Sequence, residues 1–321
     1  MTGPAELTRV LRAACRAEGI DKVGVARADA TGEAFRLEAW LERGYQAGMA
    51  WMERWAEKRV DPRELVPGAR SVVSVALNYY AEAPREPRPE EGRVARYAWG
   101  EDYHRVLKDK LRAVLARLRE ADRHLGGRAF VDTAPIQEKL WAERCGVGWR
   151  GKHSNVVTTD LGSWIYLGEL VLDRELLYDA PHADHCGSCT RCLDACPTGA
   201  IVEPYVVDAS RCLSYLTIEH RGEVDARLAA EFQEWVFGCD VCQEVCPWNR
   251  KHAKPGAEPR LEPRAGQFAL DLEETAGLED AEFHRRFADA ALERARPEGL
   301  RRNAALLLAR RAVAADAGGS S

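Results

Sequence analysis

Hydrophobic residues recur at helical spacing along several stretches of the first 180 residues, which predicts amphipathic helices there. The clearest stretch is Asp102–His124, where six aliphatic side chains form one stripe and Gly126 and Gly127 follow as a stop signal. Further helices are expected over residues 5–18, Leu37–Arg43, Met49–Glu57 and from near Pro135 to Arg144.

Short apolar runs between these helices predict strands. Ser71–Leu77, with the sequence SVVSVAL, is apolar enough for a fully buried strand. Other strands are expected at Val23–Ala26, from Phe130–Val131 onwards, near Val156 and over Trp164–Leu172. Helices and strands that alternate in this way indicate a mixed α/β (α+β) layer domain over residues 1–180.

The character of the chain changes after residue 180. Residues 181–255 are dense in Cys, Pro and Gly and contain few long periodic segments, so a separate small domain is expected there. Residues 256–321 begin with a Pro-rich linker and are expected to be a helical, Arg-rich C-terminal region from about Leu270. The stretch LRRNAALLLARRA is typical of one helix of a HEAT-type repeat, although Ala/Leu/Arg helices are common elsewhere.

The composition is that of a soluble globular protein. A length of 321 residues suggests about two domains, at roughly 150 residues each. The 46 basic and 51 acidic residues give a formal net charge of -5, and 46% of the residues are hydrophobic, which argues against wholesale disorder. No apolar run reaches the ~18 residues of a membrane span, and Arg9, Arg12 and Arg16 interrupt any signal-peptide core.

The distribution of the cysteines is more informative than the rest of the composition. Eight of the ten lie between Cys186 and Cys246, and each half of this segment ends in a Cys-Pro dipeptide. The first half has the C-x2-C-x2-C-x3-C-P spacing of bacterial ferredoxins, in which the fourth cysteine usually binds the other [4Fe–4S] cluster. In the second half, a predicted helical insertion, Ser214–Phe237, separates Cys212 from the cysteines that follow. The crossed pattern assigns Cys186, Cys189, Cys192 and Cys246 to cluster 1, and Cys196, Cys212, Cys239 and Cys242 to cluster 2.

Zinc is the alternative ligand of such cysteines, because it also accepts four thiolates at C-x2-C spacing. Two interlocked sets with both Cys-Pro dipeptides favour iron–sulfur clusters, and two adjacent clusters predict an electron relay. Thiolates at this density predict a reducing compartment, hence the cytoplasm. The remaining Cys15 and Cys145 lie in helical patterns and are expected to be buried structural thiols.

Two short motifs match cofactor sites by coincidence. Residues 146–151 (GVGWRG) fit G-x-G-x-x-G, but a helix precedes them and a strand follows, which inverts the order of a dinucleotide site. Residues 122–127 (DRHLGG) fit the D-x-H-x-x-G pattern of cobalamin proteins whose His replaces the lower axial ligand, but they end a long helix instead of following a strand. Tight-turn glycines and a helix C-cap account for these residues, although the 146–151 segment remains a candidate lining of a cofactor cavity.

Asp132 is the main candidate for catalysis in the α/β domain. A two-cluster ferredoxin needs only about 60 residues, so the residues before it are expected to hold an active site that the relay serves. Asp132 closes a strand-like segment, where apolar neighbours would raise its pKa toward that of a proton donor. Alternatively, Asp132 or Thr133 caps the helix that begins near Pro135, a role that keeps the carboxylate ionised.

Six segments, in order between about residue 20 and residue 250, together resemble the epoxyqueuosine reductase family. They are EKRVDPRELVPGARSVV, ARYAWGEDYH, VDTAPIQEKLWAERCGVGWRGKHSN, CGSCTRCLDACPTGAI, CLSYLTIEHRG and CDVCQEVCPWN. The combination is highly specific, whereas the ferredoxin-type motifs alone would not be.

The resemblance implies an oxidoreductase related to reductive dehalogenases, with base-off cobalamin and two [4Fe–4S] clusters. Such enzymes reduce epoxyqueuosine to queuosine at the wobble position of tRNA, the last step of queuosine biosynthesis. The implied fold is a nitroreductase-like cobalamin-binding domain, then a ferredoxin-like two-cluster domain and a short helical tail. The chain is expected to be a cytoplasmic monomer without membrane contact. An external ferredoxin or flavodoxin is expected to deliver low-potential electrons through the clusters to cobalt.

The resemblance also implies roles for individual residues. In the family an Asp of the VDT segment donates the proton, so Asp132 is expected to be the catalytic acid instead of a cap. Five further residues in or beside the matching segments are expected to contact cobalamin: Arg59, Tyr97, His153, Asn155 and Ser214. Their residue types alone fit a surface charge, a packed ring or turn formers equally well.

A tRNA substrate is in tension with the acidic net charge, because neutralised phosphates supply most of the nonspecific affinity for nucleic acid. Residues 283–311 contain eight Arg and three acidic residues, a local net charge of +5. This segment is expected either to contact the phosphates of the anticodon stem or to be a solvated surface helix.

Two other functions remain open from the residues alone. One is a cobalamin and iron–sulfur reductase of a free small molecule, although such enzymes usually carry an export signal, which is not expected here. The other is an electron-transfer module without a substrate. Cobalamin with about eight irons per chain would support an enzyme, whereas iron without a corrin would favour the module.

Overall fold

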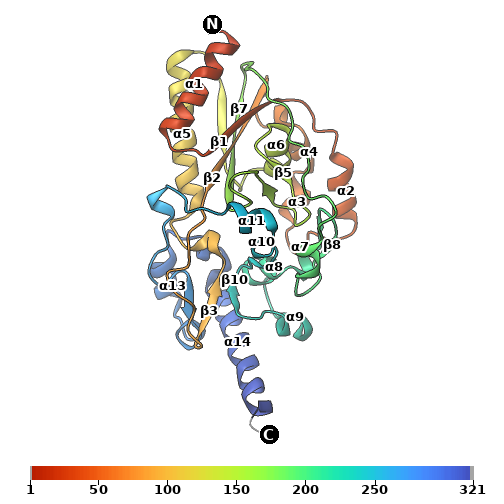
Figure 1. The fold of residues 1–321 in the computed structure, drawn as a ribbon, viewed down its shortest axis with the longest axis vertical. Coiled ribbons are helices and arrows are strands. Elements are labelled where there is room, and N and C mark those ends of the chain that lie inside the picture. Colours follow the sequence, from red (N-terminus) through yellow and green to blue (C-terminus); the bar gives the residue numbers. More distant parts are fainter. Residues whose placement is uncertain (1, 319–321) are drawn as a thin grey trace.

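A four-stranded antiparallel sheet lies at the centre of the upper half of the molecule, in the order β1-β2-β7-β4 (Figure 1). The computed structural model describes residues 2–318, and side chains as far as Val313. The strands of the sheet are β1 (Lys22–Arg27), β2 (Ser71–Asn78), β4 (Gly127–Phe130) and β7 (Ile165–Leu172). Every residue of β2 is buried, because helices cover both faces of the sheet.

Helices α1 (Pro4–Ala17) and α5 (Tyr103–Ala121) pack together on one face of this sheet, on the left in Figure 1. The predicted aliphatic stripe of α5 is buried against the strands, as expected for an amphipathic helix. Helix α6 (Glu138–Arg144) covers the other face, where Trp141 is fully buried. The other elements of this half are α2 (Ala34–Glu42), α3 (Trp51–Arg54), α4 (Ala56–Val60), β5 (Trp149–Arg150) and β6 (Val156–Val157).

A second hydrophobic core joins segments that lie far apart in the sequence. Its three-stranded sheet places β3 (Glu91–Val94) between β10 (Trp235–Phe237) and β11 (Ala269–Asp271). The long helix α14 (Arg296–Gly318) packs on β10 and projects at the bottom of Figure 1. The remaining elements are α7 (Arg191–Asp194), β8 (Ile201–Glu203), β9 (Val206–Val207), α8 (Leu213–Ile218), α9 (Ala226–Ala230), α10 (Val241–Glu244), α11 (Pro247–His252), α12 (Leu272–Ala276) and α13 (Asp280–Phe287). Residues from all three predicted regions thus share this core, and no helix of the described chain has the length and apolarity of a membrane span.

Several elements differ from the sequence predictions. Met49–Glu57 is not one helix, because Trp55 separates α3 from α4. Helix α5 ends at Ala121, three residues earlier than expected, and Gly127 begins β4 instead of capping the helix. Phe130 ends that strand, so the prediction that a strand starts there is wrong.

Two further corrections concern short strands. The insertion between Cys212 and Cys239 is helical only in α8 and α9, and its last residues form β10. The region from Leu270 likewise opens with β11, before its helices begin. Strands of three residues carry too little alternation for a pattern argument to find them.

The two short motifs have structural roles, although Asp122 and not a glycine is the C-cap of α5. Residues 146–151 follow α6 and lead into β5, so the order of a dinucleotide site is indeed inverted. A Cβ atom on Gly148 would lie 2.3 Å from the carbonyl oxygen of Val157, so this glycine allows two backbones to approach. In the second motif, the carboxylate of Asp122 pairs with Arg174 at 3.1 Å.

Arginines of the C-terminal segment make contacts inside the protein. Arg302 donates hydrogen bonds to the carbonyl oxygens of Leu216, His220 and Gly222. Arg301 donates to the carbonyl oxygen of Leu278 and also pairs with an acidic side chain of α13. These contacts stabilise the end of α8 and the turn before α13, and tRNA contact by the segment stays a prediction.

Replacing Arg302 with Ala is expected to lower the free energy of unfolding by about 1–3 kcal/mol, because three carbonyl groups lose a charged donor. Arg285→Ala is the matched control, since Arg285 is exposed and its one ion-pair partner among the described residues is Glu282 on its own helix. The melting temperatures of both variants are measured by thermal unfolding under anaerobic conditions. An unchanged melting temperature in the Arg302 variant would contradict a structural role for this side chain.

Candidate active site and cluster-binding region

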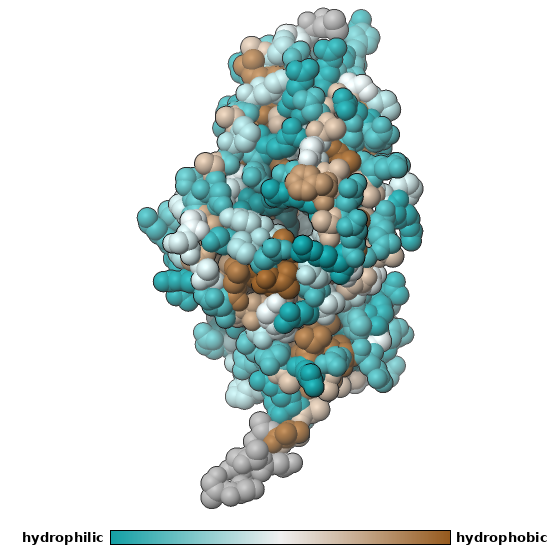
Figure 2. Space-filling view, turned by 90° about the vertical axis from the view of Figure 1, so that its right-hand side faces the viewer, coloured by the Kyte–Doolittle hydropathy of each residue, from teal (hydrophilic) through white to brown (hydrophobic). Residues whose placement is uncertain are grey.

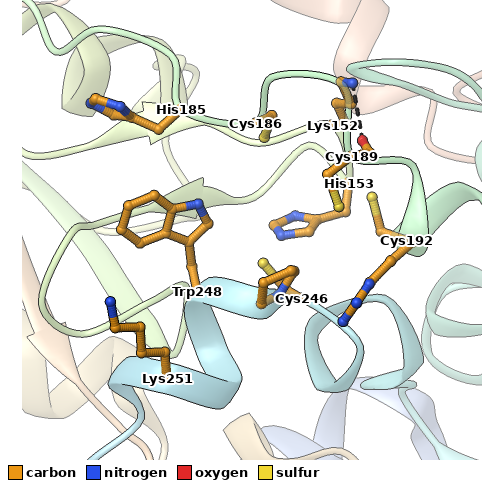
Figure 3. A pocket seen from close by; sticks show the side chains of 11 residues that line it. Lys152, His153, His185, Cys186, Cys189, Cys192, Cys246, Trp248 and Lys251 are labelled. Carbon is orange, nitrogen blue, oxygen red and sulfur yellow. Dashed lines mark hydrogen bonds between the residues drawn. The ribbon is translucent and has the colours of Figure 1, made fainter.

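The four predicted ligands of cluster 1 line one cavity of about 360 Å³ (Figure 3). They are Cys186 and Cys189 in the loop after β7, Cys192 in α7, and Cys246 immediately before α11. The imidazole ring of His153 and the side chain of Trp248 border the same space. Lys152 Nζ donates hydrogen bonds of 2.6 and 3.0 Å to two carbonyl oxygens of the cysteine loop, which fixes the position of its thiols.

The predicted ligands of cluster 2 also gather in one place. They are Cys196 after α7, Cys212 before α8, Cys239 after β10 and Cys242 in α10. Burial raises the pKa of Cys242, and the nearby thiols of Cys239, Cys212 and Cys196 raise it further. Among the described side chains, residues 2–313, no group of three or more His, Cys, Asp or Glu is placed to hold a single metal ion.

Asp132 lies at the end of a chain of hydrogen bonds that begins at the start of α5. Asp102 caps α5 by accepting from the backbone N–H of His104, and its Oδ1 lies 2.7 Å from Nδ1 of the same residue. Nε2 of His104 lies 2.9 Å from Oδ2 of Asp132. The imidazole ring therefore bridges two carboxylates, and it stacks on the ring of Tyr103 with the ring centroids 4.1 Å apart.

These hydrogen bonds determine the protonation states of His104 and Asp132. Burial opposes the charged imidazole, but the bonds to Asp102 and Asp132 prevail and raise the pKa of His104 to about 9. Burial likewise favours a neutral carboxyl at Asp132, but the bond and charge of His104 prevail and lower its pKa. At neutral pH the proton therefore resides on His104. The prediction that the pKa of Asp132 is raised is wrong for this structure.

Raising the pH is expected to weaken the ion pair between His104 and Asp132. A His with its pKa raised from 6.5 to about 9 stabilises the folded protein fully below pH 6.5, and the contribution is lost as the pH rises through about 9. We therefore expect the melting temperature of the wild type to fall more between pH 7 and pH 9 than that of His104→Gln. The same pH dependence in both proteins would contradict the raised pKa of His104.

The capping role considered for Asp132 is also excluded. Helix α6 begins at Glu138 after Gln137, several residues beyond the predicted start near Pro135. Asp132 instead has a φ of +50°, in the left-handed region that non-glycine residues rarely adopt. Its side chain is 53% exposed, so the carboxylate is open to a substrate although protein surrounds its base.

The five predicted cobalamin contacts divide between two places. Arg59 is buried close enough to Asp132 for their charges to interact, and the partly buried ring of Tyr97 also lies near Asp132. Asn155 Oδ1 accepts a hydrogen bond of 3.1 Å from Lys139, which belongs to the same group. His153 instead borders the cluster 1 cavity, and Ser214 lies in the first turn of α8, two residues after Cys212 of cluster 2.

Sequence reasoning missed His104, Glu138, Lys139 and Glu169, all of which surround or support Asp132. A signal existed for Glu169, because a carboxyl group in the middle of the apolar strand IYLGELVL needs a partner or a proton. His104 offered no such signal, since its partner lies 28 residues further along the chain.

Comparisons with known proteins agree with this arrangement. A family model described as "Epoxyqueuosine reductase QueG, DUF1730" matches residues 59–133, and a "4Fe-4S double cluster binding domain" matches residues 185–249. The epoxyqueuosine reductase of Synechocystis sp. is 50% identical over 270 residues, which cover 84% of this chain and 93% of that protein. This chain belongs to the epoxyqueuosine reductase family.

Solved epoxyqueuosine reductases share the fold over nearly the whole chain. A crystal structure with an epoxyqueuosine-modified tRNA-Tyr stem loop is 32% identical, with a TM-score of 0.89, and covers 95% of this chain and 81% of that one. The Bacillus subtilis epoxyqueuosine reductase, solved with its catalytic aspartate loop swung out of the active site, has a TM-score of 0.87 at 31% identity, covering 95% and 82%. The family assignment and the cluster model confirm iron–sulfur chemistry over zinc, whereas the individual ligands stay predictions.

Proposed function

We propose that this chain reduces the epoxide of epoxyqueuosine in tRNA and so forms queuosine. In this reaction two electrons and two protons enter, the epoxide becomes an alkene and one water molecule leaves. The observation that carries the proposal is the match, over 95% of the chain, to an epoxyqueuosine reductase solved with a modified tRNA stem loop. Asp132, exposed at the end of its hydrogen-bond chain, is the proton donor that we assign to this reaction.

Base-off cobalamin and two [4Fe–4S] clusters are the cofactors that the proposal requires. Two buried donors near Asp132, Nε of Arg59 and Nε2 of Gln137, have no acceptor among the described residues. Such donors suit the carboxamide and phosphate oxygens that surround a corrin ring. Arg59, Tyr97 and Asn155 would hold it beside Asp132, with His153 and Ser214 on the cluster side of the site. Bound cobalamin would supply the electrons that break the C–O bond.

The chain itself supplies the protons. Nε2 of His104 holds a proton at hydrogen-bonding distance from Oδ2 of Asp132, because the pKa of His104 is raised and that of Asp132 is lowered. Transfer along this bond turns Asp132 into the acid that meets the substrate, while Asp102 keeps the imidazole ring oriented.

Electrons are expected to enter at cluster 1 and to leave from cluster 2. The rim of the cluster 1 cavity carries the exposed cations Arg191 and Lys251, which would attract an acidic donor of the ferredoxin or flavodoxin type. The thiols of cluster 2 lie nearer the active site, because Cys242 and Cys212 affect the pKa of Lys139. This order supports a relay from the protein surface to the Asp132 site.

We place the enzyme in the cytoplasm as a monomer, with tRNA as its macromolecular substrate. Folded tRNA and iron–sulfur clusters both belong to a reducing, intracellular environment. Figure 2 shows a hollow in the surface, with both hydrophilic side chains and apolar patches around it.

Anaerobic turnover with epoxyqueuosine-containing tRNA, cobalamin and a strong reductant tests the proposal. Nucleoside analysis of the product should show queuosine and a matching loss of epoxyqueuosine. A small-molecule reductase would instead reduce the free nucleoside as fast as the tRNA, and an electron-transfer module would contain iron without binding cobalamin. Absence of queuosine from a protein that holds both cofactors would overturn the proposal.

A further inference from the structure

Two carboxyl groups, Glu138 and Glu169, meet beneath the loop that carries Asp132. Glu169 lies in the middle of β7, fully buried, where it pairs in register with Ser74 of β2 and Phe130 of β4. Its side chain lies within hydrogen-bonding reach of Glu138, at the first turn of α6. No cation forms an ion pair with either carboxyl among the residues that the structure describes.

The pair can be stable only if it holds a proton. Ser74 Oγ donates a hydrogen bond of 3.3 Å to Oε1 of Glu169, whereas Oε2 is buried and receives none from any described residue. Two ionised carboxylates in contact would repel each other strongly at this depth. A proton on Glu169 removes the repulsion and provides the donor that a bond to Glu138 needs.

Glu138 in turn holds the backbone of Asp132. Oε1 of Glu138 accepts a hydrogen bond from the N–H of Asp132, the residue with the unfavourable positive φ. Such a conformation persists only when surrounding contacts enforce it. The chain of contacts runs from Ser74 through Glu169 and Glu138 to the backbone of Asp132.

We propose that Glu169 is a positioning residue that, through a proton shared with Glu138, holds Asp132 in the conformation that presents its carboxylate to the substrate. The inference rests on the proposed role of Asp132 as proton donor. The active site then extends into the sheet, because Asp132 is held in place by the carboxyl group of Glu169, which the substrate cannot reach.

Other charged groups face the pair. Burial raises the pKa of Glu138 to about 8, and the charge of Asp132 adds to this effect. Lys139 and His104 act in the opposite direction on Glu138, Arg59 lies near it from α4, and Cys145 lies near Glu169 from the end of α6. Burial raises the pKa of Glu169 well above its ordinary value, so the shared proton is lost only in the alkaline range; its loss would leave two repelling carboxylates and release the N–H of Asp132.

Hydrogen exchange at the amide of Asp132, corrected for its intrinsic pH dependence, tests this in the holoenzyme without substrate. The wild type should protect the amide at pH 7 and lose at least tenfold of that protection by pH 9.5. Glu169→Gln keeps a neutral donor that cannot ionise, so its protection should persist at pH 9.5. Glu169→Leu removes the donor and should expose the amide at both values.

Turnover provides the second measurement. The rate of Glu169→Gln at pH 7 should stay within threefold of the wild type, and it should fall less than the wild-type rate between pH 8 and pH 9.5, where both proteins also lose the proton of His104. Glu143→Gln is the matched control, because Glu143 lies further along α6 and pairs with Arg150. Protection in Glu169→Gln that is as pH-sensitive as in the wild type would overturn the inference. If instead the protection pattern holds but no variant forms queuosine, the proposed function fails and the positioning of Asp132 stands.

Discussion

Asp132→Asn is expected to lower the rate of epoxyqueuosine reduction by about 10²–10⁴-fold, the usual contribution of a positioned proton donor. The amide can still bond to Nε2 of His104, which lies 2.9 Å from the carboxylate oxygen in the wild type, but it cannot carry the proton onward. Nucleoside analysis of tRNA after single turnover measures the effect.

The control for this change is Asp160→Asn, because Asp160 is an exposed carboxylate whose one ion-pair partner in the described part of the chain is Lys22. Iron and cobalamin contents should be the same in both variants and in the wild type. Wild-type turnover by Asp132→Asn would show that another group donates the proton, with His104 as the nearest candidate.

Cys242→Ala is expected to remove cluster 2, about four irons per chain, and with it all turnover by the low-potential donor. Cys242 lies in α10 with the other three predicted ligands around it, and an alanine leaves a four-iron cluster one thiolate short. Iron analysis and electron paramagnetic resonance of the reduced protein distinguish loss of one cluster from loss of both.

Cys15→Ala is the matched control for the cluster variant, since Cys15 is 1% exposed and burial raises the pKa of its thiol to about 12. This variant should keep all its iron and its activity. A full iron content in Cys242→Ala would contradict the crossed assignment of ligands to the two clusters.

Local spacing made the cysteine sets predictable, because a cluster constrains the distance between its ligands along the chain. Strand β2 and the apolar stripe of α5 were also predictable from local pattern, because many residues in each repeat one pattern. Contacts between distant segments could not be predicted in this way. Asp102, His104 and Asp132 meet only because α5 and β4 pack on the same sheet, and nothing in either segment specifies that meeting.

The pKa of Asp132 shows more clearly what cannot be predicted from the sequence alone. Apolar neighbours in the sequence predicted a neutral acid, and burial does act in that direction. The imidazole ring of His104 reverses the result, because a cation at hydrogen-bonding distance outweighs loss of water around the carboxylate. The residues next to Asp132 in the sequence indicate how far its carboxylate is removed from water. The charged group that pairs with the carboxylate is determined by the fold.

The shared second core has a consequence for the biogenesis of the enzyme. Asn303 of α14, with no exposed surface, donates hydrogen bonds of 2.8 and 2.9 Å to the carbonyl oxygens of Thr217 and Val236, next to the segments that present Cys212 and Cys239. During synthesis these segments leave the ribosome some 60–90 residues before Asn303 can join them. We therefore expect cluster 2 to be inserted only after α14 has been synthesised and has docked on these segments.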